Sequence, residues 1–186
     1  MISRFMKELK MNIDRPDWRV DDTSNFGVDL SMGVHYDRML HNNIQDILIE
    51  NRFDLGRYQR AYTTYEALSK HYNISMDNMS IGIGATEVIE RIFKSIKFNH
   101  LYIVEPSFEM VEVYCKIYNK SYTLITYDDI DSLSGEAIYI ANPNGNNGTS
   151  HNIQSIFDKF DLCIVDEAYA DFYPTNSVLQ IGRAHV

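Results

Sequence analysis

The sequence has little cysteine and no long apolar run. Only two of its 186 residues are cysteines, Cys115 and Cys163, and neither has a cysteine or histidine at the spacing of a metal site. We therefore expect two buried thiols, with no metal site and no disulfide framework. No apolar run approaches the roughly 20 residues of a membrane span, and residues 1–10 contain no apolar signal-peptide core. These absences predict a cytoplasmic protein without a membrane partner.

Positive charge is also scarce. Lysine and arginine number 17 against 26 aspartate and glutamate residues, which gives a formal net charge of -9 at pH 7. Because binding to a nucleic-acid backbone depends on many cationic side chains, the sequence argues against a nucleic-acid partner. Hydrophobic residues make up 45% of the chain, which is enough for a folded core, and the length fits a single domain.

Hydrophobic periodicity from residue 58 onward predicts helices and short strands in alternation. A helix with an aromatic core stripe is expected first; the stripe consists of Tyr58, Tyr62, Tyr65, Leu68 and Tyr72. Five short apolar runs are predicted as strands, at residues 79–83, 101–104, 122–126, 137–141 and 162–165. Helices are expected to begin at Gly84, at Pro106 and near Ile153, whereas residues 1–56 show no long periodic element. The alternation predicts an α/β fold with a mainly parallel sheet.

Three segments directly follow predicted strands, at residues 82–87, 142–149 and 165–172. Ligands of a parallel sheet bind beyond the carboxyl ends of its strands. The glycine turn at 82–87 opens a helix, whose free N–H groups and dipole favour a phosphate. Asp166 and Glu167 follow a buried strand, and a buried carboxylate needs a cation or hydrogen-bond donors. Each segment also has a purely structural interpretation, as a helix-opening turn, a solvated loop or a capping aspartate.

The first segment also half matches a dinucleotide fingerprint. Gly82 and Gly84 have the right spacing, and Glu105 lies about 20 residues further on, where a ribose-binding acid is expected. Glu87 stands in the place of the third glycine. This match leaves open a non-catalytic nucleotide-binding module of the Rossmann type.

Four motifs in order extend the pattern: GATE (84–87), EPSF (105–108), NPNGNNG (142–148) and VDEAYADF (165–172). Together they resemble the fold-type I pyridoxal-phosphate enzymes, and within them the class I/II aminotransferases of the histidinol-phosphate aminotransferase type. The resemblance covers residues 58–172. It implies a three-layer αβα large domain with a mainly parallel sheet at residues 57–180, incomplete at its C-terminus, after an N-terminal arm or partial small domain at residues 1–56.

The resemblance also implies a cofactor and partners. The cofactor would be pyridoxal 5'-phosphate, the amino donor an amino acid or amino-alcohol phosphate, and the acceptor a 2-oxo acid. A homodimer would form when the protein is full length. Tyr58 corresponds to a tyrosine that reaches the cofactor phosphate of the neighbouring subunit.

Individual residues take their roles from the same resemblance. Ala85 and Thr86 would hold the cofactor phosphate at a helix N-terminus, and Phe108 would stack on the pyridine ring. Asp166 would pair with the ring nitrogen and keep it protonated, and Tyr169 would donate to the phenolate oxygen. Asn144 is expected at that same oxygen, because Gly145 replaces the family's second central asparagine.

The family's Schiff-base lysine is missing from the chain, so no catalytic residue is assigned. Lys94, Lys116 and Lys159 lie on predicted helices and are interpreted as solvated surface residues. Residues 181–186 resemble the translation of a sequencing adapter, and we expect the native sequence to stop near Gln180. The chain is thus expected to be an inactive N-terminal fragment of an aminotransferase. A decarboxylase on the same scaffold stays an alternative, since it would use the same aspartate and tyrosine.

Overall fold

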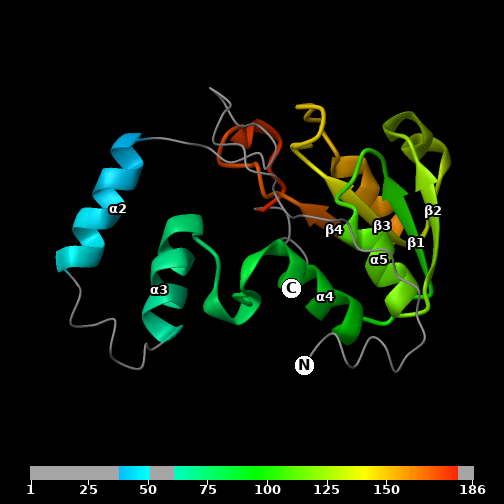
Figure 1. The fold of residues 1–186 in the computed structure, drawn as a ribbon. Helices are drawn as coiled ribbons and strands as arrows, with labels where there is room; N and C mark the ends of the chain where they lie inside the picture. Colours follow the sequence, from blue (N-terminus) through cyan, green and yellow to red (C-terminus); the bar gives the residue numbers. More distant parts are fainter. Residues whose placement is uncertain (1–37, 51–60, 180–186) are drawn as a thin grey trace, which may run out of the picture. The chain divides into compact units, whose positions relative to one another are not determined.

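A computed structural model describes residues 38–50 and 61–179 of the chain (Figure 1). These residues fall into two units, one formed by 38–50 with 61–81 and the other by 82–179. Each unit is described by itself. No helix within the described ranges is long and apolar enough to cross a membrane.

The first unit is helical. It contains α2 (Arg38–Glu50), α3 (Ala61–Tyr72) and the short 3-10 helix η1 (Met76–Asn78). Helix α2 contradicts the expectation that residues 1–56 hold no long periodic element. The missed signal is the helical spacing of Ile44, Ile47 and Leu48.

Helix α3 confirms a helix at the predicted aromatic stripe, but the stripe is not buried. The Tyr62 side chain is 60% exposed. Tyr65 is half-buried, and its hydroxyl oxygen accepts a hydrogen bond from the backbone N–H of Ile81 at 3.1 Å. The prediction of a core stripe is therefore wrong for Tyr62 and holds in part for Tyr65, Leu68 and Tyr72, which are half-buried.

The second unit is built on a parallel four-stranded sheet. Its strands are β1 (His100–Val104), β2 (Ser121–Ile125), β3 (Gly135–Ala141) and β4 (Phe160–Asp166), in the order β2-β1-β3-β4. Every adjacent pair is parallel, and Ala141 of β3 lies opposite Asp166 of β4. The predicted α/β fold with a mainly parallel sheet is confirmed.

Both faces of the sheet are covered. Helices α4 (Gly84–Ser95) and α5 (Met110–Ile117) pack on one face of the sheet (Figure 1). Their buried side chains join the central strands in one core cluster, which includes Ile89, Phe93, Val111, Tyr114, Leu101, Ile103 and Tyr139. The 3-10 helices η2 (Tyr127–Ser132) and η3 (Gln154–Asp158) cover the other face with Ile130, Ile153 and Ile156. A last 3-10 helix, η4, spans Pro174–Asn176.

Three predicted elements differ from the structure. Residues 79–83 form no strand, because the N–H of Ile83 donates to the Glu87 carboxylate at 3.2 Å instead of joining a sheet. The helix expected from Pro106 begins at Met110, after a loop that faces the carboxyl end of the sheet. The helix expected near Ile153 is the 3-10 helix η3. It is only five residues long, because β4 begins at Phe160, two residues after it ends.

The two cysteines are both free thiols. Cys115 is buried and Cys163 is half-buried. Burial raises the pKa of the Cys115 thiol to about 12 and that of Cys163 to about 11. The expectation of two unpaired thiols in the apolar interior is confirmed for Cys115 and holds in part for Cys163.

Candidate functional site

The carboxyl ends of three neighbouring strands meet at a cavity of about 240 Å³. Strands β1, β3 and β4 end at Val104, Ala141 and Asp166, and the loops that follow them supply most of its wall. The first turn of α4 adds Ala85. The cavity therefore lies where a parallel α/β sheet places its ligands.

Asp166 supplies the carboxylate of the cavity. It is the last residue of β4 and is half-buried. Its Oδ2 accepts a hydrogen bond from the Tyr139 hydroxyl at 2.7 Å, and its Oδ1 accepts one from the backbone N–H of Ala168 at 3.0 Å. A carboxylate at the end of a buried strand is predicted to need hydrogen-bond donors, and these two groups supply them. Each oxygen keeps further acceptor capacity for a ligand.

The loop between β1 and α5 supplies an aromatic wall. Phe108 lines the cavity and is half-buried against the core cluster that α4 and α5 form with the sheet. The same loop presents backbone carbonyl groups to the neighbouring loop at residues 142–149. Asn144 donates to the carbonyl oxygen of Pro106 at 2.6 Å, and Asn146 donates to that of Ser107 at 3.2 Å.

The asparagine side chains of the loop at 142–149 brace its backbone. Asn142 is 1% exposed; its amide donates to the His151 carbonyl oxygen at 3.0 Å and accepts from the His151 N–H at 2.9 Å. Asn144 is 7% exposed, and its Oδ1 accepts from the N–H of Asn146 at 2.9 Å. The interpretation of this segment as a solvated loop is wrong for Asn142 and Asn144, which are built into the fold, and holds for residues 145–149, which are exposed.

Tyr169 lies beside a glycine of that loop. Its ring lines the cavity and is 38% exposed. A methyl group added at Gly145 would lie 2.7 Å from Cζ of Tyr169, closer than real contacts allow. The absence of a side chain at Gly145 therefore gives the tyrosine ring its place at the cavity wall.

Helix α4 begins beside the same cavity. Gly84, its first residue, has φ of +77°, a conformation that glycine adopts without strain. Ala85 lines the cavity, whereas the half-buried Thr86 does not, and the Thr86 carbonyl accepts from the Tyr114 hydroxyl at 3.1 Å. The first N–H groups of a helix have no partner within it, so this turn offers donors and a positive dipole end to an anion.

Five of the residues predicted for the site line one cavity: Ala85, Phe108, Asn144, Asp166 and Tyr169. Tyr58 lies outside the described residues. Sequence reasoning missed Tyr139, although a tyrosine in the middle of a buried strand needs a partner for its hydroxyl, and Asp166 needed a donor.

The lysines lie elsewhere. Lys94 and Lys116 are exposed, as expected. Lys159 differs, because its side chain is 25% exposed and pairs with Asp131 at 2.8 Å. No lysine lines the cavity within the described part of the chain. Across the same residues, no group of three or more histidine, cysteine or acidic side chains could hold a metal ion.

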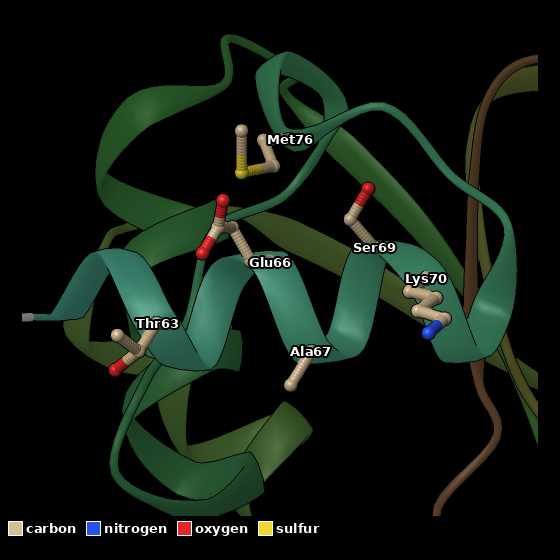
Figure 2. Close-up of a pocket in the computed structure, with 6 residues that line it drawn as sticks. All are labelled: Thr63, Glu66, Ala67, Ser69, Lys70 and Met76. Carbon is tan, nitrogen blue, oxygen red and sulfur yellow. The ribbon is translucent and has the colours of Figure 1, made fainter.

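A second hollow lies on the helical unit, over α3 and η1. It measures about 540 Å³ and is lined by Thr63, Glu66, Ala67, Ser69, Lys70 and Met76 (Figure 2). In Figure 2, Glu66 and Ser69 point to one side of the helix and Ala67 to the other. The Ser69 hydroxyl already donates to the carbonyl oxygen of Ile74 at 2.6 Å. Because its polar groups do not converge, this hollow is not the candidate site.

Comparison with solved structures shows the fold. The chain has the fold of the fold-type I aminotransferases. It is similar to the histidinol-phosphate aminotransferase from Clostridium acetobutylicum, with a TM-score of 0.56 and 24% identity over 77% of this chain and 47% of that one. It is also similar to the L-threonine-O-3-phosphate decarboxylase from Porphyromonas gingivalis, with a TM-score of 0.61 and 19% identity over 70% of this chain and 44% of that one.

Comparison with curated sequences names a more specific group: the chain is related to the histidinol-phosphate aminotransferases. It is 27% identical over 155 residues to the enzyme of that name from Pyrococcus furiosus, which covers 75% of this chain and 46% of the relative. The chain spans about half the length of this relative. No protein-family model matches it. The sequence resemblance drawn from the four motifs is thereby confirmed.

The relationship and the fold disfavour the Rossmann interpretation. A dinucleotide fingerprint needs a strand directly before its first glycine, and no strand precedes Gly82 in residues 61–81. The segment that half matched that fingerprint is instead the turn that opens α4 beside the cavity.

Proposed function

We propose that the chain forms the cofactor-binding part of a pyridoxal-phosphate-dependent aminotransferase. The full-length protein would transfer an amino group between an amino acid or amino-alcohol phosphate and a 2-oxo acid. The observation that carries this proposal is one cavity that joins the Asp166 carboxylate, the Phe108 and Tyr169 rings and the first turn of α4. The relationship to histidinol-phosphate aminotransferases supports it.

The residues of the cavity fit the chemistry of pyridoxal 5'-phosphate. Asp166 is an anionic acceptor for the ring nitrogen, and Phe108 offers an aromatic face for stacking. Tyr169 carries a hydroxyl for the phenolate oxygen. The first turn of α4 suits the phosphate through Ala85, which lines the cavity, and through the neighbouring Thr86, which does not line it. When bound, the cofactor supplies an electron sink for the carbanion at the substrate α-carbon.

Asn144 remains a proposed contact of the phenolate oxygen. Its Nδ2 already donates to Pro106 and its Oδ1 already accepts from Asn146. An amide group has two N–H donors and two oxygen lone pairs, so one of each is left for a ligand. Its first role is to hold the two loops together.

A homodimer with shared sites and a cytoplasmic location belong to the same proposal. The resemblance that assigns Tyr58 to the partner's cofactor phosphate supports the dimer. The sharing of a site between two copies is tested by mixing a Tyr58→Phe variant with an Asp166→Asn variant. Recovery of one intact site in the mixture is expected if the site is shared.

Binding of pyridoxamine 5'-phosphate to the 186-residue chain tests the proposed function. This amine form needs no covalent bond to a lysine, and its fluorescence reports binding directly. We expect saturable binding that Asp166→Asn weakens at least tenfold, because the variant loses the charge that faces the ring nitrogen. No binding, or equal binding by the variant, would refute the proposal. Binding of NAD in its place would restore the nucleotide-binding alternative.

Decarboxylation is the second candidate reaction. The similarity in fold to the L-threonine-O-3-phosphate decarboxylase from Porphyromonas gingivalis keeps it in view. Both reactions would use Asp166 and Tyr169 in the same way. Assay of the full-length gene product separates them: amino transfer that requires a 2-oxo acid favours the aminotransferase, and release of carbon dioxide without that acceptor favours the decarboxylase.

A further inference from the structure

Tyr139 is a core residue whose hydroxyl hydrogen-bonds to the Asp166 carboxylate of the cavity. It lies in the middle of β3 and is fully buried. Ala141 pairs with Asp166 across the two strands, and Tyr139 comes two residues before Ala141, so it points to the same face of the sheet. From there its hydroxyl reaches Oδ2 of Asp166 at 2.7 Å.

The direction of this hydrogen bond is fixed. Burial, with the nearby Asp166 charge and the hydrogen bond to it, raises the pKa of Tyr139 far above its ordinary value of 10.0. The phenol therefore stays protonated and donates to the Asp166 carboxylate. The backbone N–H of Ala168 holds the other carboxylate oxygen at 3.0 Å. With a donor on each oxygen, the plane of the Asp166 carboxylate cannot turn without breaking a hydrogen bond.

We propose that Tyr139 is a positioning residue that orients the Asp166 carboxylate toward the cationic ring nitrogen of the cofactor. This inference rests on the proposed function, because the ring nitrogen belongs to the cofactor named there. A charge-assisted hydrogen bond is strong only when donor and acceptor are well aligned. Tyr139 acts through Asp166 and does not itself line the cavity.

The competing explanation is that Tyr139 only fills the core. Its ring belongs to the cluster that α4 and α5 form with the sheet, so its loss could loosen the cavity as a whole. A ligand without the ring nitrogen separates the two explanations. Orientation of Asp166 affects only a ligand that carries the nitrogen, whereas a loosened cavity weakens every ligand of the same shape.

The experiment compares two ligands on the full chain. One is pyridoxamine 5'-phosphate, and the other is its analogue in which a CH group replaces the ring nitrogen. Tyr139→Phe keeps the ring and removes the hydroxyl. We expect it to weaken binding of pyridoxamine 5'-phosphate about tenfold, the size of one hydrogen bond to a charged group, and to leave the analogue unchanged.

Tyr102→Phe is the matched control. Tyr102 lies on the adjacent strand β1, pairs with Ile138 and packs on the opposite face of the sheet. Its loss of a hydroxyl should change the affinity for neither ligand. Equal weakening of both ligands by Tyr139→Phe, or no weakening of either, would overturn the positioning role.

Two further measurements keep this inference separate from the proposed function. If Asp166→Asn weakens pyridoxamine 5'-phosphate and Tyr139→Phe does not, only the role of Tyr139 fails. If the unchanged chain binds neither ligand, the proposed function fails. In that case the hydrogen bond is still tested without cofactor, by the ¹³C resonance of the Asp166 carboxyl carbon at neutral pH. Tyr139→Phe should shift that resonance and Tyr102→Phe should not; an unmoved resonance would refute the hydrogen bond itself.

Discussion

Gly145→Ala is the substitution that most directly tests how the cavity wall is built. The added methyl group would lie 2.7 Å from Cζ and 2.8 Å from Cδ2 of Tyr169, so the ring must move. Backbone strain is not the reason for glycine here, because the positive φ values among the described glycines belong to Gly84 and Gly148. The conflict is therefore between the new methyl group and one side chain.

The size of the effect follows from the exposure of that side chain. Overpacking a closed core costs about 1–3 kcal/mol. The Tyr169 ring is 38% exposed and can turn toward solvent, so we expect a loss of stability near the lower end, about 1 kcal/mol. The displaced hydroxyl can no longer donate to a ligand. Affinity for pyridoxamine 5'-phosphate should therefore fall about tenfold, the size of one lost hydrogen bond, and Tyr169→Phe should lower it by the same amount.

A double-mutant cycle measures this conflict. Urea unfolding and ligand titration are carried out on Gly145→Ala, on Tyr169→Ala and on the double variant. With the ring removed, Gly145→Ala should be nearly neutral in both assays. If it costs as much in the Tyr169→Ala background as in the native one, the steric reasoning is wrong. Gly148→Ala is a useful contrast, because its φ of +72° predicts backbone strain with nothing for the methyl group to meet.

Three further predictions concern the second unit. Asn142→Ala leaves the N–H and carbonyl of the half-buried His151 without their side-chain partner, so urea unfolding should show a loss of about 2 kcal/mol; a loss below about 1 kcal/mol would contradict the bracing role. The backbone N–H and hydroxyl of Thr126 both donate to Asp129 and hold the pKa of that carboxyl below its ordinary value of 3.8. The ionised Asp129 carboxyl therefore stabilises the fold above pH 3.8, and this stabilisation is lost as the pH falls through the lower pKa of the folded state. Asp129→Ala should lower the free energy of unfolding at pH 7 and leave it unchanged well below that pKa. An equal loss at both pH values would contradict this pH dependence. Burial raises the pKa of Cys115 to about 12, so a thiol reagent at pH 8 should label it only after unfolding, and rapid labelling of the native chain would contradict its burial.

The sheet of the second unit is predictable from the sequence, because its strands are continuous apolar runs between polar turns. The site is predictable from the resemblance that the four motifs carry, and five of the residues that line the cavity are expected from it: Ala85, Phe108, Asn144, Asp166 and Tyr169. The pairing of Tyr139 with Asp166 depends on the register between β3 and β4, which no local pattern in the sequence specifies. Register is set by the packing of both faces of the sheet together.

The errors have a common physical cause. Residues 79–83 have the composition of a strand, but Glu87 takes the N–H of Ile83 that a sheet partner would need. The asparagines of residues 142–149 have the composition of a solvated loop, but their amides find backbone partners in the loop at 105–108 and at His151. In both cases a hydrogen bond between a side chain and the backbone decides the structure, locally at Glu87 and over 9 to 39 residues of sequence at the asparagines.

The bracing of residues 142–149 also bears on how quickly a ligand is captured. A loop held by its own amide side chains has its conformational entropy already removed before any ligand arrives. Binding then orders little further chain, so little affinity is lost to ordering. Association should accordingly occur in one kinetic step whose observed rate rises linearly with ligand concentration. The slow phase that is seen when a binding loop folds only after the ligand arrives should be absent.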